Sequence, residues 1–483
     1  MMLIKVFNIM YYITLYMEKD VENKWVIILG CLLLFCVQFI GNMVTVALPT
    51  IASDLDLTVE MLNSINLAFL IMSVSLMLPL GKYVSKYGIG KYLKFSIVLM
   101  IVGLLLSACS TDIHTLLFSR VLQGVATAII NGAMYVIVTI QLPSDKLGYA
   151  LGIMGSCGYV GLCLSNTVSG MVVYYLSWRV VFLILIPVYL IMLFILIKLN
   201  KEWHTDDIKE VDNIGSILYA LFMGLFLYGI VKLDNNNIFV LILSIVILII
   251  FLRFEKNTEH PVYNLRLLKN FQYVLGNYSA FVMYFMTFIA SYILNFYLQE
   301  ALGYDTRFTG LFLLATPLAV VLVSSFAGKL SDKRDERTIS SIALIFILIN
   351  VIILFFMDCV PIYVLLLACV LQGIGHGLFS SPNNRFVLTI VDQKDLSDAS
   401  TILSTSKDVG KSMSLSLFSI ICGVFLGTSN AIDDNIHSLL ISSKIMLGIV
   451  ILLGFSSIIL LILNKKRQCR QPNFFFFFLW CNN

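Results

Sequence analysis

Long apolar runs recur along this chain, and they limit its possible folds more than any other feature. About fourteen runs reach roughly twenty residues, the length a helix needs to cross a bilayer. Of 483 residues, 59% are hydrophobic and only 12% are charged, against roughly 25% in an ordinary soluble domain. Because lipid offers the backbone no hydrogen-bond partners, such runs must be helical. The sequence therefore predicts an all-α polytopic membrane protein.

The apolar runs place each predicted helix between two polar breaks. The predicted helices cover residues 25–48, 62–83, 92–110, 115–140, 148–174, 180–198, 213–233, 237–254, 272–298, 308–330, 338–357, 361–382, 399–427 and 438–463.

Charges in the loops alternate along the chain and predict its orientation. Basic residues fill every second loop, whereas the other loops carry mainly aspartate and glutamate. Short loops rich in lysine and arginine stay in the cytoplasm. We therefore expect both termini to be cytoplasmic and the protein to lie in the cell membrane. The basic loops contain Lys82, Lys86, Lys91, Lys94, Lys198, Lys201, Lys209, Arg253, Lys256, Arg266, Lys269, Lys329, Lys333, Arg334, Arg337, Lys465, Lys466, Arg467 and Arg470.

Two segments of the chain repeat. VLQGV at residues 121–125 returns as VLQGI at 370–374, and Gly81-Lys82 returns as Gly328-Lys329. Repeats of this kind are typical of alternating-access transporters, with the solute path between the halves. The predicted organisation is six helices, a two-helix insert and six helices. Its parts are an N-terminal cytoplasmic segment (1–24), two six-helix bundles (25–200 and 270–464), the insert (211–256) and a cytoplasmic tail (465–483).

Five motifs are distributed along the chain: VTVALPTI (44–51), GKYVSKYGIGK (81–91), SRVLQG (119–124), SWRVVFLILIP (177–187) and GKLSDKRDER (328–337). They resemble motifs of the major facilitator superfamily, and in particular of its fourteen-helix drug–proton antiporter branch, the EmrB/QacA-like exporters. The resemblance covers roughly residues 25–465. The resemblance implies the major facilitator fold and export of amphipathic molecules or drugs, driven by protons.

Four positions depart from the pattern of that branch. The first-helix acid is replaced by Ile40, and the aspartate of the first loop motif by Ser85. The fifth-helix motif reads SNTVSG at residues 165–170 and lacks its proline, and Leu185 replaces an asparagine. Transport is therefore expected, whereas proton coupling needs another titratable group.

Arg120 lies inside an apolar run, where a charge costs at least about 2.5 kcal/mol. The resemblance gives it a role in proton coupling; from the residues alone, it either holds an acid or anion or clamps backbone carbonyls. Gln123 and its repeat mate Gln372 either hydrogen-bond a neighbouring helix or line the transport cavity. His376 is the best titratable candidate, because imidazole titrates near neutral pH. Among carboxylates, Asp408 lies within its span beside two lysines.

The two copies of the basic loop motif are candidate gates at the cytoplasmic face. The resemblance implies a charge latch between helices, whereas the alternative is a pair of solvated loops with ion pairs worth about 0–1 kcal/mol. The gating candidates are Gly81, Ser85 and Lys86 in the first copy and Gly328, Asp332, Lys333 and Arg334 in the second.

Small and neutral polar residues supply the remaining candidates. Glycines at every third position of the fifth helix predict close packing with another helix, and some bending. These glycines are Gly152, Gly155, Gly158 and Gly161, with Gly170 further along. The chain has 34 Phe, 22 Tyr and 19 Met but no evident acidic anchor at mid-span for a cationic substrate. Candidates for lining the cavity are Asn42, Asn66, Asn131, Tyr135, Asn277, Tyr284 and Asn295.

Three functions from different classes fit the sequence. The first is a proton-coupled exporter, the second a facilitator or differently coupled carrier of neutral or anionic solutes, and the third a non-transporting membrane sensor or scaffold. An enzyme is not expected, because nucleotide-binding, metal-ligand and nucleophile motifs are missing from the sequence. The expected partners are a small-molecule substrate, protons and the lipid bilayer. We expect neither nucleic acid nor a cofactor or metal, and a monomer.

Overall fold

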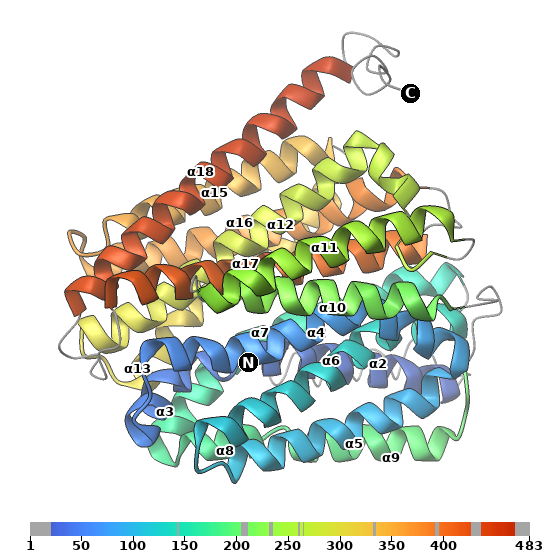
Figure 1. Cartoon of the computed structure of the whole chain (residues 1–483), viewed down its shortest axis with the longest axis horizontal. Coiled ribbons are helices and arrows are strands. Elements are labelled where there is room, and N and C mark those ends of the chain that lie inside the picture. The colour runs from blue at the N-terminus through green and yellow to red at the C-terminus, as the bar shows by residue number, and fades with distance from the viewer. Residues whose placement is uncertain are drawn as a thin grey trace.

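The computed structural model of the chain is a bundle of long helices that lie side by side (Figure 1). It describes residues 21–142, 144–203, 211–230, 235–258, 261–263, 265–331, 335–391, 396–426 and 436–468. Within these ranges, 13 helical segments are long and apolar enough to cross a membrane, and the shorter apolar helix Asn213–Gly229 makes the fourteenth. The prediction of an all-α polytopic membrane protein is confirmed.

The helices follow the predicted order of six, two and six. The first six spans are α2 (Val21–Asn42) with η1 (Thr45–Ala47) and α3 (Leu48–Leu55), α4 (Val59–Tyr87), α5 (Ile89–Ala108), α6 (Ile113–Gln141), α7 (Ser144–Tyr175), and α8 (Trp178–Leu183) with α9 (Ile186–Leu199). The insert is α10 (Asn213–Gly229) and α11 (Asn235–Asn257). The last six are α12 (Phe271–Phe296) with the π-helix η3 (Tyr297–Ala301), α13 (Thr306–Leu313) with α14 (Ala315–Ser331), α15 (Glu336–Phe355), α16 (Ile362–Thr389), α17 (Leu396–Leu426) and α18 (Ile436–Gln468), preceded by η2 (Leu265–Lys269).

Three spans are broken where the sequence predicted single helices. Runs 180–198 and 308–330 each contain two helices in the structure. In run 25–48, α2 ends at Asn42, and η1 and the start of α3 at Leu48 follow. Each second helix begins one to two residues before a proline, namely Pro49, Pro187 and Pro317. Proline lacks an N–H and disfavours helical geometry in the residue before it, so it is tolerated best in a first turn. Hydropathy alone does not register these breaks, because the residues at the breaks are apolar.

The two six-helix halves repeat the same packing pattern. In the first half, α2 packs on α7, α4 on α6, and α5 on α8 and α9. In the second half, α12 packs on α17, α14 on α16, and α15 on α18. These are the same pairs in repeat order, so the halves are related by a pseudo-two-fold axis. The halves meet along two seams, one between α4 and α17 and the other between α7 and the α13–α14 pair.

The two ends of the bundle differ in charge. We call the end where α4, α9 and α11 finish the basic end, because Lys86, Lys198 and Lys256 lie in their last turns. At the opposite end, Asp112 caps α6 by accepting a hydrogen bond from the Thr115 N–H. That N–H and the Thr115 hydroxyl hold the pKa of the Asp112 carboxyl below its ordinary value. The acidic residues of this end therefore include helix caps.

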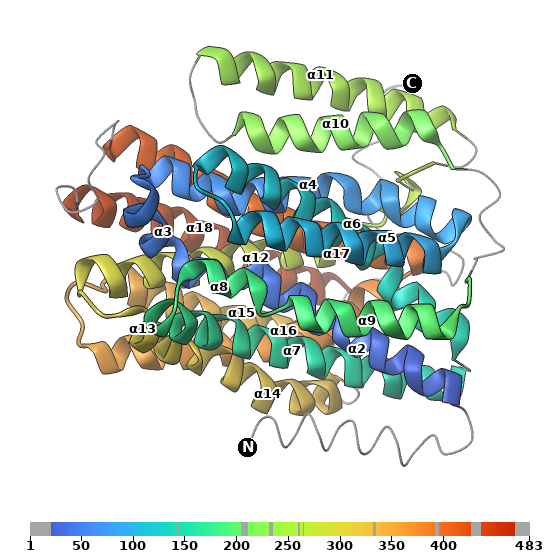
Figure 2. The same ribbon diagram turned by 90° about the horizontal axis from the view of Figure 1, so that it is seen from below.

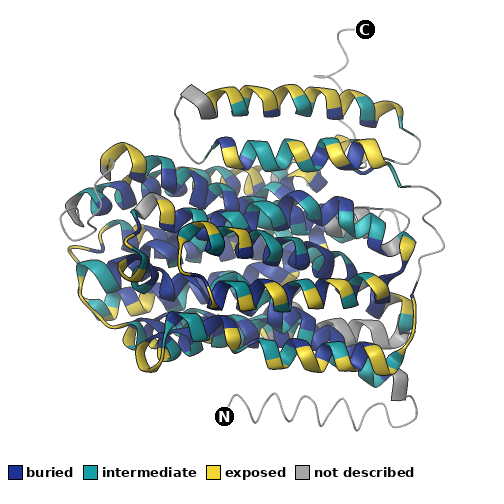
Figure 3. Ribbon diagram, turned by 60° about the horizontal axis from the view of Figure 1, so that its bottom comes forward, coloured by how far each residue is buried: buried dark blue, intermediate teal, exposed yellow. Residues whose placement is uncertain are grey.

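The insert lies at one edge of the bundle (Figure 2). It is held through α10, which packs on α4 and also touches α17. A small apolar cluster of Leu78, Tyr219, Phe251 and Val262 joins it to α4. The outward face of α11 is exposed and apolar, as expected for a helix that faces lipid (Figure 3). The residue limits of the two bundles and of the insert remain a prediction.

Only part of the glycine stripe on α7 is closely packed. A Cβ at Gly161 would lie 2.3 Å from the Phe35 carbonyl oxygen of α2, and a Cβ at Gly158 would lie 2.9 Å from Leu34. Gly155, on the same helix, has nothing within 4 Å of the corresponding position. The backbones of α2 and α7 therefore approach each other at Gly161, whereas Gly155 faces open space.

Replacing Gly161 by alanine should lower the stability of the fold. The new methyl group would meet a backbone oxygen that cannot move away without shifting α2, and such overpacking costs about 1–3 kcal/mol. We expect Gly161→Ala to lower the midpoint of thermal unfolding in detergent, measured by intrinsic fluorescence.

Gly155→Ala is the matched control on the same helix. It should leave the unfolding midpoint unchanged or raise it slightly, since alanine favours the helix over glycine by about 1 kcal/mol. Equal midpoints for the two variants would contradict the close approach of α2 and α7 at Gly161.

Candidate functional site

Arg120 is fully buried between three helices of the first half. It projects from α6, and its Nη1 donates a hydrogen bond of 2.6 Å to Gln123 Oε1 one turn further along. Its Nε lies 3.4 Å from the Ile65 carbonyl oxygen of α4, and its guanidinium carbon lies 4.4 Å from the centre of the Phe69 ring. The ring face and the amide oxygen both stabilise the cation where water is excluded.

Gln123 connects this arginine to a third helix. Its Nε2 donates to the Gly103 carbonyl oxygen (3.1 Å) and to Ser107 Oγ (2.8 Å), both on α5. A Cβ at Gly103 would lie 2.9 Å from Gln123, and a Cβ at Gly124 would lie 2.6 Å from the Phe69 carbonyl oxygen. The two glycines therefore permit the close approach of α4, α5 and α6 that the hydrogen bonds require.

Three buried donors near this network have no acceptor among the described residues. They are Arg120 Nη2, Asn63 Nδ2 and Asn66 Nδ2. Asn63 and Asn66 lie one turn apart on α4. The Oδ1 atom of Asn63 is used, because it accepts a hydrogen bond of 2.6 Å from the Tyr292 hydroxyl of α12. The surplus here is of donors, so acceptor-rich groups fit this region better than donors do.

The repeat mate of Gln123 binds a different neighbour. Gln372, on α16, donates to the Thr287 carbonyl oxygen (2.8 Å) and to Ser291 Oγ (2.9 Å), both on α12. Gln123 reaches the third span of its half, whereas Gln372 reaches the first span of its own. The repeated LQG sequence therefore gives the same residue type two different structural partners.

A second polar cluster lies at the middle of four helices, at the interface between the halves. His376 of α16 packs edge-on against Tyr284 of α12, with ring centres 5.3 Å apart, and against Tyr159 of α7 at 6.4 Å. Lys411 of α17 lies with its Nζ 5.3 Å from the centre of the Tyr284 ring. Each of these four residues is near the midpoint of its helix, so the cluster lies at mid-depth.

Two further residues of α17 complete this mid-depth cluster. Lys411 donates a hydrogen bond of 2.8 Å to Asp408 Oδ1, and Lys407 donates one of the same length to Asn384 Oδ1 of α16. Lys407 Nζ also lies 5.7 Å from the centre of the Tyr284 ring. The side chains of Lys411 and Asp408 keep 24% and 18% of their surface accessible, although helices surround them. Arg120, in contrast, is fully buried.

The halves are joined by hydrogen bonds towards the end opposite the basic one. Asn295 Nδ2 donates to the Thr45 carbonyl oxygen (2.9 Å), where the first span is broken, and Gln299 Nε2 donates to the Val46 carbonyl oxygen (3.3 Å). The Thr167 hydroxyl of α7 donates to the Gly310 carbonyl oxygen of α13 (3.2 Å). Together with the Tyr292–Asn63 bond, these contacts close this end of the interface.

Glycine contacts tighten the same closure on the α7 side. A Cβ at Gly170 would lie 2.4 Å from the Thr306 carbonyl oxygen of α13, and a Cβ at Gly310 would lie 2.6 Å from the Asn166 carbonyl oxygen of α7. The two helices therefore touch backbone to backbone. Arg307 of α13 adds a hydrogen bond of 3.0 Å to the Tyr175 hydroxyl.

Two other asparagines predicted to line a cavity, Asn42 and Asn277, use their side-chain amides in hydrogen bonds within the protein. Asn42 Nδ2 donates to the Gln38 carbonyl oxygen of its own helix (2.9 Å). Asn277 Nδ2 donates to the Tyr273 carbonyl oxygen (2.9 Å), and its Oδ1 accepts from Ser406 of α17. Asn131 is half-buried on α6. The side chain of Tyr135, also predicted, lies outside the described residues.

The basic loop motifs are described in part. Gly81 lies where α4 crosses α6. A Cβ at Gly81 would lie 3.6 Å from the Gly132 Cα. Lys82 donates a hydrogen bond of 2.6 Å to the Pro261 carbonyl oxygen after the insert, and Lys86 lies over the Tyr87 ring. The first motif therefore contacts the segment that follows the insert. The side chains of Gly152, Ser85 and Gly328, and all of Asp332, Lys333 and Arg334, lie outside the described residues.

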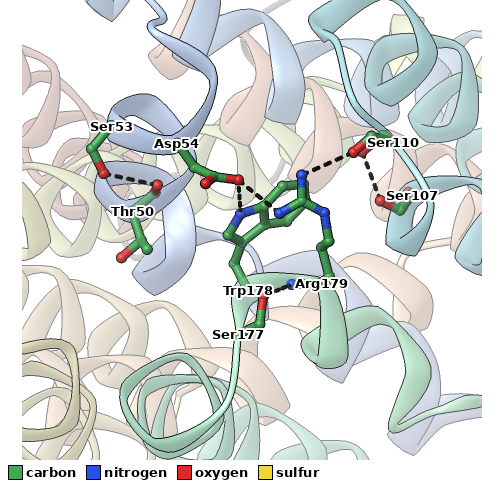
Figure 4. Close-up of polar contacts among 8 residues, drawn as sticks. All are labelled: Thr50, Ser53, Asp54, Ser107, Ser110, Ser177, Trp178 and Arg179. Atoms are coloured by element: carbon green, nitrogen blue, oxygen red, sulfur yellow. Dashed lines mark hydrogen bonds and ion pairs between the residues drawn. The ribbon is translucent and has the colours of Figure 1, made fainter.

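An ion-pair cluster at the end opposite the basic one was not predicted as a site. Asp54 Oδ2 accepts hydrogen bonds from Arg179 Nη1 (2.7 Å) and Trp178 Nε1 (2.9 Å), and Arg179 Nη2 donates to the Ser110 carbonyl oxygen at 3.2 Å (Figure 4). Ser177 caps α8. The SWR motif at residues 177–179 thus connects the first, third and sixth spans. This motif was the sequence signal from which the ion-pair cluster could have been predicted.

Comparison with known proteins places this geometry in a family. A family model described as Major Facilitator Superfamily matches residues 30–415. The riboflavin transporter RibZ of Clostridioides difficile is 27% identical over 401 residues, which cover 82% of this chain and 88% of that protein. The multidrug resistance protein Stp of Mycobacterium tuberculosis is 22% identical over 409 residues (82% and 75%). The lincomycin resistance protein LmrB of Listeria innocua is 25% identical over 320 residues (64% and 67%).

The match to the family model covers most of the chain, and the fold agrees with it. The repeated packing of two six-helix halves, the two seams between them and the polar residues at mid-depth are the features of a multi-pass transporter. The motifs that resembled this family are distributed over both halves. The chain belongs to the major facilitator superfamily.

Proposed function

We propose that this protein is a secondary active exporter of amphipathic small molecules that works by alternating access and is driven by protons. One observation carries the proposal: hydrogen bonds and glycine contacts close the interface between the halves at one end, whereas the mid-depth cluster retains accessible surface. A site that is closed towards one side and reachable at mid-depth is what alternating access requires. Two relatives that are named for drug resistance, Stp and LmrB, support export as the direction.

We place the basic end in the cytoplasm and both termini with it. Lysines in the last turns of α4, α9 and α11 support this orientation under the positive-inside rule. In that orientation the closed end faces outward and the conformation opens inward. We also assign the chain to the fourteen-helix drug–proton antiporter branch, because its two-helix insert occurs between the halves.

We assign proton binding to His376 and the neighbouring Asp408. The acid of the first span is replaced by Ile40, which is fully buried in α2. His376 and Asp408 are instead titratable and lie at mid-depth. His376 packs against Tyr284, and Asp408 pairs with Lys411, whose ammonium lies over the same Tyr284 ring. Arg120, Gln123 and Gln372 fix the helices around this interface, so they position the site through the backbone and do not carry the proton. The basic loop motifs act as cytoplasmic gates in this scheme.

A facilitator of neutral or anionic solutes is the second candidate. The buried Ile40 and the surplus of basic groups in the mid-depth cluster favour it. The riboflavin transporter among the relatives is compatible with either candidate.

Transport and coupling can be tested together in proteoliposomes that contain the purified protein. We expect uptake of at least one of ethidium, rhodamine 6G, fluorescein and riboflavin into liposomes, with an opposite proton flux reported by a trapped pH-sensitive dye. Uptake without proton flux would support the facilitator instead of the proton-driven exporter. If neither a substrate gradient nor a pH gradient drives uptake, both candidates are contradicted.

The variant His376→Ala should change the pH dependence of transport. If the imidazole carries the proton, its loss should lower pH-driven uptake at least about tenfold, as for removal of a group used in general acid–base transfer, while exchange of substrate without a pH gradient persists. His114→Ala is the matched control, because His114 is exposed at the start of α6. Identical pH profiles for wild type and His376→Ala would refute the assignment.

The variant Gly170→Ala should disfavour the closed outer end. The methyl group would meet the Thr306 carbonyl oxygen, so the halves should separate there and transport should slow. Labelling of a cysteine placed at Thr309, which is fully buried on α13, should rise when an impermeant maleimide is added from outside. The cysteines that are exposed in the described part of the chain, Cys109 and Cys359, are first changed to serine.

Gly155→Ala again serves as the control, since it adds the same methyl group to α7 where there is space. If both variants label at the wild-type rate, the Gly170 contact does not hold the outer end closed.

A further inference from the structure

We propose that the substrates carry a negative charge on a planar aromatic frame, and that this charge binds between Lys407 and Lys411 beside Tyr284. The inference rests on the proposed function, because it names the substrate class of the mid-depth cluster. It follows from the arrangement of charge, aromatic surface and accessibility at that one place.

Three nitrogen-bearing side chains gather around one tyrosine. The ammonium groups of Lys407 and Lys411 lie 5.7 and 5.3 Å from the centre of the Tyr284 ring, and the His376 ring lies 5.3 Å from it. The lysines come from α17, the histidine from α16 and the tyrosine from α12. Two helices thus direct basic groups to a tyrosine of a third helix.

The acids around this point do not balance its cations. Asp408 pairs with Lys411 at 2.8 Å, whereas Lys407 donates its hydrogen bond to the neutral amide of Asn384. Among the described residues, no carboxylate lies within 4 Å of the Lys407 ammonium. The remaining helices of the cluster contribute Tyr159, Tyr284 and His376, which add no negative charge. One positive charge is therefore left over at mid-depth.

A surplus cation within a membrane protein selects the charge of its ligand. An ammonium group without a counter-ion in a low-dielectric region is costly, and a substrate carboxylate or sulfonate would offset that cost. A cationic substrate would instead face two ammonium groups, and like charges at such distances repel. An anion is thus favoured twice, by attraction and by exclusion of cations.

The neighbouring surface suits a flat ring system. Tyr159 and Tyr284 both pack edge-on against His376. The aromatic series continues along α12 through Phe288 and Tyr292, whose rings are stacked 6.4 Å apart. Aromatic rings pack favourably on such faces and edges. Lys411 and Asp408 keep accessible surface, so a ligand can reach them. Arg120 is the other intramembrane cation of this region, and it is sealed among three helices.

Two dyes with the same three-ring xanthene frame test the inference directly. Fluorescein is an anion at neutral pH and rhodamine 6G is a cation. Binding of each to the purified full-length protein in nanodiscs is measured by fluorescence anisotropy, and transport of each is measured in proteoliposomes. We expect the wild-type protein to bind and transport fluorescein in preference to rhodamine 6G.

Opposite charge changes in the cluster should move the affinity in opposite directions. Lys407→Gln keeps an N–H group for Asn384 but removes the charge, and should weaken fluorescein binding about tenfold, as for loss of one charge-assisted hydrogen bond. Asp408→Asn removes the single acid and should strengthen it. Lys444→Gln is the control, because this substitution removes the same charge at a distant place, where Lys444 pairs with the loop residue Asp358.

The outcomes separate this inference from the proposed function. Rhodamine 6G bound as tightly as fluorescein, or Lys407→Gln and Asp408→Asn changing the affinity in the same direction, would overturn the anionic class while transport itself remains. Failure of both dyes to bind would also overturn it, and uptake of ethidium or riboflavin would then show that the transporter still functions. Absence of all transport would overturn both.

Discussion

The hydrogen bond from Arg120 to Gln123 meets a requirement that lipid imposes on the whole chain: a polar group within the membrane must find its partner in the protein. Gln123 passes the connection to α5, and Phe69 of α4 covers the guanidinium. Three spans are held at fixed distances by one charge. Because α4 also carries the insert and contacts α17, the placement of the arginine affects contacts far beyond its own helix.

The sequence was sufficient for the number and order of the spans, because twenty consecutive apolar residues have few other uses. It was not sufficient for their shape. The breaks before Pro49, Pro187 and Pro317 fall among apolar residues, so hydropathy is continuous across them. Whether proline breaks a helix depends on its neighbours, since Pro79 and Pro382 lie within continuous helices.

The candidate site was predicted residue by residue more successfully than as an assembly. Arg120, Gln123 and His376 stand out because polar side chains are rare in such runs, but their partners come from other helices. Gln372 repeats the sequence around Gln123 and still binds a different span. The role of Lys407 and Lys411 becomes apparent only from the contact of both with Tyr284, more than 120 residues away in the sequence. Side-chain pairing across helices is set by tertiary packing, which periodicity does not encode.

The position of the insert makes the two seams of the bundle unequal. A molecule dissolved in the bilayer meets α10 and α11 where it approaches the seam between α4 and α17, because α10 contacts both helices there. The insert packs on this seam and leaves the contact between α7 and α14 to the two halves alone. The pseudo-symmetry of the halves therefore does not extend to their lipid-facing seams. At the seam between α4 and α17 a molecule dissolved in the bilayer meets the insert, whereas at the seam between α7 and α14 it meets the two halves directly, in competition with lipid tails.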